Sequence, residues 1–174
     1  NPATFAGTSY VRWSGINVRN AYHSLIMLFN QANYNVIENC ELSDYGYITP
    51  DAGINLGDRS SFNVMRGNTI HTARHAYADP LHRASGINMW WGAADGSYQV
   101  AKNQGNIIYD NYFYSETEGL SDSVGGYANF QYSDGPYKDS DIYDNTTEDT
   151  RDDAFEVEGG NINGSIWLYE EILK

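Results

Sequence analysis

The sequence predicts an all-β fold, a right-handed parallel β-helix (a solenoid) of about five to six coils, which forms one domain over residues 1–174. Three observations lead to this prediction: a short motif recurs along the chain, a second series of alternating segments follows its copies, and the composition favours strands and turns. The chain has 15 Tyr and 17 Gly but only 4 Pro. Aromatic residues favour strands and Gly permits sharp turns, so strands joined by bends are expected.

The recurring motif consists of an apolar residue, any residue, an Asn, Gly or Asp, a small residue or Asn, any residue, and usually a second apolar residue. Its five copies are 18–23, 37–42, 65–70, 108–113 and 142–147. They begin 19, 28, 43 and 34 residues apart. A helical repeat needs segments of fixed length, whereas strand coils place extra residues in surface loops, so the uneven spacing favours strand coils.

The third and fourth positions of the motif predict a bend followed by a ladder. Asn, Gly and Asp tolerate the left-handed backbone that a sharp bend between two strands requires. The fourth position is occupied by Ala21, Cys40, Asn68, Asn111 and Asn145. In stacked coils the three asparagines would form an inward ladder, in which each amide bonds to its neighbour about 4.8 Å away. We expect this ladder to be structural.

The second series comprises residues 53–56, 86–90, 128–131 and 155–158. Alternation along these segments places one set of side chains in the core and the other outside. The predicted core residues are Ile54, Leu56, Ile87, Met89, Phe130, Phe155 and Val157. The stack is expected to end in a sixth coil, where residues 168–173 are the segment that would suit a helix.

The outward residues of the second series predict a carbohydrate-binding groove. Its expected substrate-binding residues are Asn55, Asn88, Trp90, Asn129 and Gln131. Amides pair with sugar hydroxyls, and the apolar face of a pyranose stacks on an indole. A long loop enters this face at 72–85 and carries Arg74, His75, His82 and Arg83. The alternative is that these are ordinary exposed asparagines and loop residues with only local bonds.

The sharpest local signal is a group of four carboxylates within the seven positions 152–158: Asp152, Asp153, Glu156 and Glu158. Glu156 and Glu158 would share the outward face of a strand, with Cα atoms about 6.6 Å apart. Crowded carboxylates repel unless one keeps its proton or a cation neutralises them. The first outcome suits general acid/base cleavage of a glycosidic bond, and the second suits Ca²⁺. A third alternative is a simple acidic bend.

Charge and composition exclude several classes of function. A formal net charge of −13 disfavours binding to nucleic acid, and no apolar run approaches the roughly 20 residues that membrane insertion by a helix requires. Cys40 is the single cysteine, so no intrachain disulfide is expected. His71 and His75 have the spacing of two zinc ligands on a helix, but they lie where a strand leads into a loop, so no zinc site is expected. No metal or obligatory cofactor is predicted, with Ca²⁺ the ion to test. The chain reads as a module of a larger protein.

The asparagine bends, from about residue 10 to residue 167, resemble those of the pectate lyase-like superfamily. Residues 152–163 are similar to segments of large surface β-helix proteins, and the archaeal disaggregatases, which loosen the polysaccharide that holds cells together, are the family they resemble most. The resemblance implies an extracellular polysaccharide as substrate class and an extracellular or cell-surface location. The motifs of pectate lyases and polygalacturonases are missing, so no catalytic residue carries over.

We therefore expect a module that cleaves a polysaccharide, with the four carboxylates at its centre and the loop Arg and His residues as proton carriers or charge partners. An acid/base hydrolase is favoured over a lyase. The alternative is a non-catalytic carbohydrate-binding or structural surface module, whose uncovered end strands would allow end-to-end self-association. An enzyme should gather these side chains in one cleft, whereas a structural module should scatter them.

Overall fold

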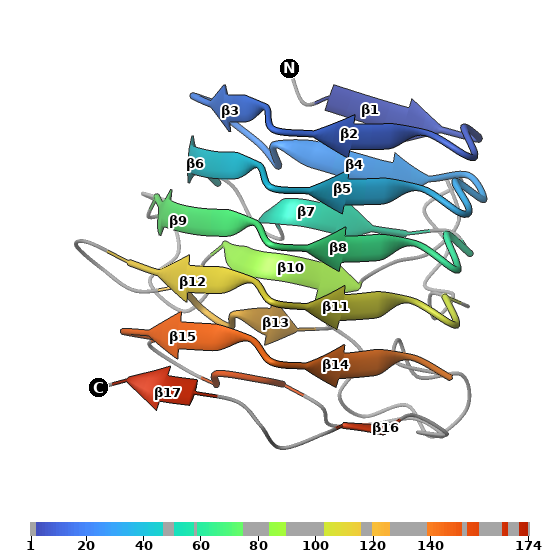
Figure 1. Cartoon of the computed structure of the whole chain (residues 1–174). Coiled ribbons are helices and arrows are strands. Elements are labelled where there is room, and N and C mark those ends of the chain that lie inside the picture. The colour runs from blue at the N-terminus through green and yellow to red at the C-terminus, as the bar shows by residue number, and fades with distance from the viewer. Residues whose placement is uncertain are drawn as a thin grey trace.

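The computed structural model describes residues 3–46, 51–57, 59–74, 84–89, 103–115, 120–125, 139–150, 153–156, 165–166 and 171–173. In these ranges the chain forms three sheets (Figure 1). Sheet A contains β1 (Ala3–Ala6), β4 (Ile26–Phe29), β7 (Ala52–Leu56), β10 (Ser85–Met89) and β13 (Val124–Gly125). Sheet B contains β2 (Arg12–Ser14), β5 (Val36–Glu38), β8 (Val64–Arg66), β11 (Ile107–Tyr109), β14 (Asp141–Tyr143) and β16 (Ser165–Ile166). Sheet C contains β3 (Asn17–Arg19), β6 (Glu41–Tyr45), β9 (Thr69–Ala73), β12 (Tyr112–Tyr114), β15 (Thr146–Glu148) and β17 (Glu171–Leu173).

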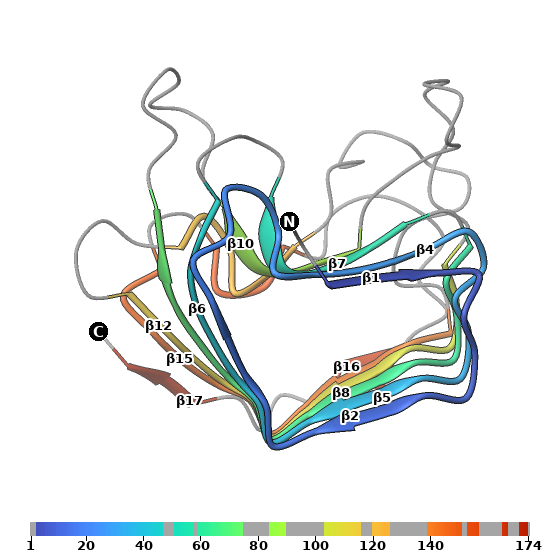
Figure 2. The same cartoon turned by 90° about the horizontal axis from the view of Figure 1, so that it is seen from above.

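The chain visits sheets A, B and C in turn, and all the neighbouring strands listed above pair in parallel. Viewed from the N-terminal end, the chain runs clockwise as it recedes, so the coil is right-handed (Figure 2). Five coils contribute to all three sheets, and a sixth adds β16 and β17. The predicted right-handed parallel β-helix is confirmed. The helix suggested for 168–173 is wrong at its end, because Glu171–Leu173 is strand β17.

The motif builds the bend between sheets B and C. Its third residues in the last four copies are Asn39, Gly67, Asp110 and Asp144, with φ angles of 52°, 60°, 55° and 52°. These angles are left-handed, as predicted. Because the bend takes only two residues, β5 leads directly into β6, and each later coil repeats this turn.

The first copy of the motif was placed five residues too late. Trp13 pairs with Ile37 and Val18 pairs with Leu42, so the copy is 13–18 and not 18–23. Both segments fit the motif at its bend, because Gly15 and Asn20 each have a positive φ. Ile16 therefore holds the ladder position predicted for Ala21.

The predicted ladder is confirmed for its three asparagines, which are buried inside this corner. Asn68 Nδ2 donates to Asn111 Oδ1 at 3.0 Å, and Asn111 Nδ2 donates to Asn145 Oδ1 at 3.0 Å. The backbone N–H of Cys40 donates to Asn68 Oδ1 at 3.0 Å. Each amide ties one coil to the next, so the ladder holds the coils in register.

A second ladder, which was not predicted, lies between sheets A and B. Asn35 Nδ2 donates to Asn63 Oδ1 at 3.1 Å, and Asn63 Nδ2 donates to Asn106 Oδ1 at 3.3 Å. The backbone N–H of Asn106 donates to Ser140 Oγ at 3.1 Å. All four side chains are buried. Each stands two residues before an apolar residue that begins a motif copy, so the spacing of the copies contained the signal for this ladder.

The inward residues of sheet A form one wall of the core. Four of the predicted core residues are fully buried: Ile54, Leu56, Ile87 and Met89. Ile87 pairs with Val124, which bridges to Phe155, and Phe155 is half-buried against the core. Val124 therefore takes the place that Ala128 has in the predicted segment 128–131. Phe130 and Val157 lie outside the described residues.

Sheets A and C approach closely where the strands of sheet A begin. A Cβ atom on Gly86 would lie 2.5 Å from Phe113 Cδ1 and 2.5 Å from the backbone oxygen of Ser123. One coil earlier, a Cβ atom on Gly53 would lie 2.6 Å from Ile70 Cγ2. Neither position has room for a side chain, so glycine is required at both.

Candidate functional site

The predicted site residues of sheet A fall into one column of neighbouring strands. Asn55 pairs with Asn88, as predicted, but Asn88 then pairs with Gly125. The backbone N–H of Glu156 donates to the backbone oxygen of Val124 at 2.9 Å, which places Glu156 beside Gly125 in a parallel pair. The predicted column is therefore wrong at its third position, where Gly125 replaces Asn129. Asn129 itself lies outside the described residues.

Asn55 and Asn88 are buried, with exposed fractions of 9% and 5%, so they do not form the open surface that strand alternation predicted. The Asn55 Nδ2 donates to Ser24 Oγ at 3.5 Å. The Asn88 Oδ1 is buried and accepts no hydrogen bond within the described part of the chain. A buried amide oxygen without a donor costs about 1–3 kcal/mol. Asn88 is therefore the side chain in this column that a hydrogen-bond donor from a ligand would stabilise.

Asp122 is a carboxylate of this face that sequence reasoning missed. It is buried and covers the outer side of Gly125, because a Cβ atom on Gly125 would lie only 2.9 Å from Asp122 Oδ2. Ser85 Oγ donates to Asp122 Oδ2 at 3.4 Å, and the backbone N–H of Asp153 donates to Asp122 Oδ1 at 3.4 Å. Since Val124 bridges to Phe155, Asp122 and Asp153 hold equivalent positions in successive coils. Aligning 122–125 with 153–156 would have found Asp122.

Two carboxylates, Asp122 and Glu156, therefore lie in adjacent coils on the same face. Glu156 is half-buried, and its neighbour Phe155 packs against the core, so the Glu156 side chain points to the outer side. Its Cα is about one strand spacing, roughly 4.8 Å, from that of Gly125, which the Asp122 carboxylate covers. Asp153 is exposed. Asp152 and Glu158, the other two predicted carboxylates, lie outside the described residues.

Of the predicted loop residues, Arg74 lies within the described ranges, and its side chain pairs with Asp44 of sheet C. Arg74 Nε donates to Asp44 Oδ1 at 2.5 Å, and the pair also forms an ion pair through a second guanidinium nitrogen. The remaining predicted site residues lie outside the described ranges: His75, His82, Arg83, Trp90 and Gln131. Within the described ranges, no three His, Cys, Asp or Glu side chains gather closely enough to hold a metal ion.

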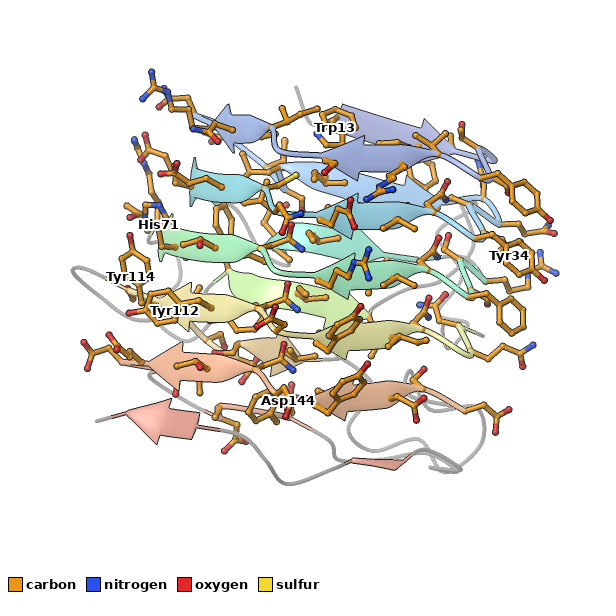
Figure 3. The ribbon with its side chains drawn as sticks, in the orientation of Figure 1. Trp13, Tyr34, His71, Tyr112, Tyr114 and Asp144 are labelled. Carbon is orange, nitrogen blue, oxygen red and sulfur yellow. The ribbon has the colours of Figure 1, made fainter. Side chains whose placement is uncertain are left out.

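Sheet C carries an aromatic surface of its own (Figure 3). The His71 ring stacks on Tyr114 with centroids 4.5 Å apart and planes 6° apart, and Tyr112 lies 5.1 Å from Tyr114. His71 Nε2 lies 3.4 Å from Glu41 Oε1. Ring faces next to a carboxylate also suit sugar binding, so sheet C is a second surface of this chemical type.

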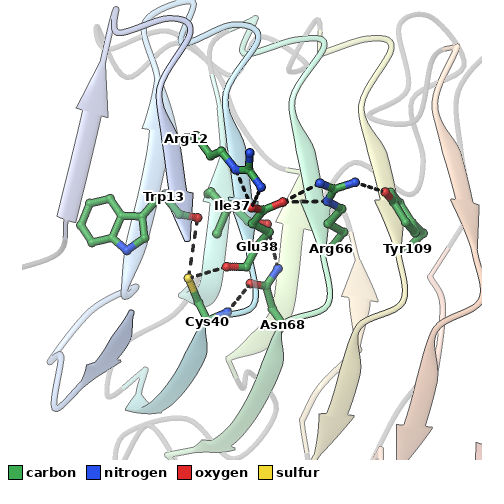
Figure 4. Close-up of polar contacts among 8 residues, drawn as sticks. All are labelled: Arg12, Trp13, Ile37, Glu38, Cys40, Arg66, Asn68 and Tyr109. Atoms are coloured by element: carbon green, nitrogen blue, oxygen red, sulfur yellow. Dashed lines mark hydrogen bonds and ion pairs between the residues drawn. The ribbon is translucent and has the colours of Figure 1, made fainter. Parts of the chain in front are cut away.

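Sheet B carries a charged cluster that is saturated by its own partners (Figure 4). Glu38 is buried, and it accepts hydrogen bonds from Arg66 Nε at 2.8 Å and from Arg12 Nε at 2.5 Å. Arg66 also donates to the Tyr109 hydroxyl at 2.6 Å. The hydrogen bond from Arg66 is the main reason why the pKa of Glu38 is lowered from its ordinary value of 4.5. We interpret this cluster as structural, because each described partner is already committed.

Comparison with known proteins adds no family to this description. No protein-family model matches the chain, and neither a curated protein nor a solved structure matches it. In the described ranges no helix is long and apolar enough to cross a membrane. The function therefore has to be argued from the face of sheet A and its carboxylates.

Proposed function

We propose that this chain binds and cleaves a polysaccharide on the outer side of sheet A, around Gly125. The proposal depends on one observation: two carboxylates, Asp122 and Glu156, lie in adjacent coils there, and the neighbouring strand β10 presents the buried Asn88 Oδ1 without a donor. A sugar hydroxyl is a donor of the kind that Asn88 Oδ1 would accept. Asn88 would then position the sugar beside the two carboxylates.

The chemistry we propose is acid/base hydrolysis. One carboxyl group donates its proton to the leaving oxygen, and its partner either activates water or attacks the anomeric carbon. In the overall reaction water adds across the broken C–O bond, with hydrogen on the leaving oxygen and hydroxyl on the anomeric carbon. Asp122 is buried and Glu156 is half-buried, so the two carboxylates offer different environments for the acid and the base that the reaction requires. This pair favours hydrolysis over elimination.

Substrate and location follow from this proposal. A protein with a net charge of −13 repels an acidic polymer, so a neutral polysaccharide is the favoured substrate. The polysaccharides of walls and matrices lie outside cells or on their surface, so we propose that the chain acts there. Trp90, Gln131, His75, His82 and Arg83 keep their predicted roles at the groove and its rim.

Activity of two variants tests the proposal. Glu156→Gln and Asp122→Asn should each lower the rate of product release about 10²-fold or more, because each removes a general acid or base. Incubation with neutral and uronic polysaccharides would be followed by new reducing ends and by the ultraviolet absorbance of an unsaturated product. The matched control is Glu148→Gln on sheet C, which should retain the wild-type rate. Wild-type rates in both site variants, with folding checked by circular dichroism, would disprove the assignment.

Asn88→Ala separates binding from chemistry. Loss of a positioning acceptor should raise KM more than it lowers kcat, whereas loss of a catalytic group lowers kcat. The ratio of reducing ends to ultraviolet absorbance also decides between reaction types, since elimination alone produces the unsaturated sugar. A product that absorbs in the ultraviolet in proportion to chain breaks would replace hydrolysis by elimination.

The second candidate function is carbohydrate binding without cleavage. Its support is the His71, Tyr114 and Tyr112 surface of sheet C, which presents rings beside Glu41. It predicts retention on an insoluble polysaccharide, reduced by Tyr114→Ala, and no product from any substrate of the panel.

A further inference from the structure

The corner between sheets A and B carries three stacked aromatic side chains, one from each of the first three coils: Tyr10, Tyr34 and Phe62. We call them the aromatic ladder. The ring centroids of Tyr10 and Tyr34 lie 5.1 Å apart and those of Tyr34 and Phe62 lie 5.1 Å apart, with planes within 7° and 9° of parallel. Their exposed fractions are 79%, 47% and 40%, so the ladder faces solvent. Figure 3 shows Tyr34 at the outer edge of the molecule.

The backbone of the aromatic ladder is strained. Tyr10, Tyr34 and Phe62 have φ angles of 64°, 58° and 58°, in the left-handed region that bulky residues rarely adopt. In the next two coils the same position is held by Gly105 and Asp139, which tolerate it. Stacking of the two pairs and partial burial of Tyr34 and Phe62 offset this strain. The part of each ring that stays exposed is the part that a ligand would contact.

Hydrogen bonds hold the ladder from both sides. Before each aromatic residue, side chains cap the neighbouring backbone: Asn33 Oδ1 accepts the N–H of Ser61 at 2.8 Å, and Ser61 Oγ accepts that of Gln104 at 3.1 Å. Asn35 follows Tyr34 and Asn63 follows Phe62 in the second ladder described above, and Val11, which follows Tyr10, donates its backbone N–H to Asn35 Oδ1 at 3.0 Å. The rings are thus fixed in place before any ligand arrives, which lowers the entropy lost on binding.

We infer that the aromatic ladder is a binding platform for a neutral polysaccharide chain, separate from the carboxylate site; the ligand class rests on the proposed function. Because the three rings stack on one another, the faces between them are occupied, and the ladder presents the outer face of Tyr10 and the exposed edges of Tyr34 and Phe62. The apolar C–H face of a pyranose stacks on the Tyr10 ring, and the sugars that follow lie along the two edges. None of the three residues is charged, and the column continues to Asp139 on a protein of net charge −13, so an acidic polymer is disfavoured. The exposed amides of Asn30 and Gln31 precede Tyr34 in the turn between β4 and β5 and suit sugar hydroxyls.

The test compares a ladder variant with a matched surface variant. In Tyr34→Asn/Phe62→Asn both substitutions place a residue that tolerates the left-handed backbone, so the fold should persist. The control is Tyr22→Asn, which removes a tyrosine that is 58% exposed and lies outside the ladder. Affinity would be measured by calorimetry with cellohexaose and xylohexaose, and by native gels containing soluble neutral glucan, xylan or polygalacturonate.

We expect the ladder variant to lose at least tenfold in affinity for a neutral probe, and the control to bind as the wild type does. Equal affinity in a folded ladder variant, or no wild-type binding to any neutral probe, would overturn the inference. So would a changed sedimentation coefficient without a change in affinity, since the ladder would then join two copies of the chain. If the double variant does not fold, Tyr10→Asn serves instead, because Tyr10 stacks on one ring only.

Failure of this inference can be told from failure of the proposed function. Glu156→Gln should abolish cleavage but retain the binding that depends on the ladder, and the ladder variant should still cleave short soluble oligosaccharides. If the wild type binds a neutral polysaccharide through the aromatic ladder but cleaves no substrate, only the catalytic proposal is disproved. If the wild type cleaves a substrate but its binding does not depend on the aromatic ladder, only the present inference is disproved.

Discussion

Removal of one ladder amide tests how strongly the asparagines hold the coils together. Asn111 is 2% exposed and bonds in both directions along the stack. Its Oδ1 accepts the backbone N–H of Asn68 at 3.1 Å and Asn68 Nδ2 at 3.0 Å, and its Nδ2 donates to Asn145 Oδ1 and to the backbone oxygen of Met65, each at 3.0 Å. Asn111→Ala removes these four contacts at once, together with the hydrogen bond from Nδ2 to the backbone oxygen of Tyr109 at 3.0 Å.

The expected loss is large because one donor loses its only described side-chain acceptor. The backbone N–H of Asn68 would be buried without Asn111 Oδ1, at a cost of about 1–3 kcal/mol, whereas Asn68 Nδ2 still reaches the backbone oxygen of Ile37 at 3.0 Å. The other lost bonds contribute about 0.5–1.5 kcal/mol each. We expect a decrease of about 3–5 kcal/mol in the free energy of unfolding, against a typical total of about 5–15 kcal/mol.

Urea unfolding followed by circular dichroism measures this decrease. The matched control is Asn17→Ala on strand β3, where the side chain is exposed and the change should stay within about 0.5 kcal/mol. If Asn111→Ala destabilised the protein no more than Asn17→Ala, the ladder amides would contribute nothing beyond ordinary surface residues. The interpretation of the ladder as the element that sets the register would then be wrong.

Three further predictions concern single positions. Because the folded-state pKa of Glu38 is lowered, its ionised form stabilises the fold above about pH 4.5, and this contribution is lost as the pH falls through the lower folded pKa. The difference in melting temperature between Glu38→Gln and the wild type should therefore shrink in acid. A difference that stays constant with pH would contradict this prediction. Cys40 Sγ lies 3.8 Å from the backbone oxygen of Trp13, the atom to which a ladder amide would donate at this position. Cys40→Asn should therefore raise the free energy of unfolding by about 1 kcal/mol. A variant less stable than the wild type in urea unfolding would show that the amide does not fit. Gly86→Ala should destabilise the fold by about 3 kcal/mol or more, because the added methyl group overpacks against Phe113. The control Gly15→Ala should cost about 1–2 kcal/mol, because Gly15 has a left-handed φ angle but open space around it. Equal losses in urea unfolding would contradict the close approach of sheets A and C.

The bends and the first ladder were predictable because they require particular residue types at positions that repeat. Asn68, Asn111 and Asn145 recur with their bend residues, so the pattern survives coils of different length. The first copy is predicted five residues too late because Gly15 and Asn20 both suit a bend and both have left-handed φ angles. The second ladder was missed because the motif was read from its first apolar residue onward, which leaves out Asn35 and its equivalents.

The site was harder to predict because side-chain patterns fail where strands are short. Strand β13 has two residues, and Gly125 has no side chain to mark its alternation, so the segment containing Asn129 was taken in its place. Burial of Asn55 and Asn88 depends on what packs over sheet A, which alternation along a strand does not contain. Asp122 is absent from the prediction because its equivalent Asp153 belongs there to a local cluster with Asp152, Glu156 and Glu158, and a local cluster gives no equivalence between coils.

The positions of the two ladders lie five residues apart in every coil from the second to the fifth: Asn35 and Cys40, Asn63 and Asn68, Asn106 and Asn111, and Ser140 and Asn145. All the variation in coil length therefore falls outside this segment. A tandem duplication of one coil, such as the 28 residues from Asn35 to Phe62, would bring both ladder positions and both bends with it. The added coil would present the same donors and acceptors to its neighbours as the original did. Such a protein can lengthen during evolution by whole coils, and each new coil adds one position to every outward column on which selection can act.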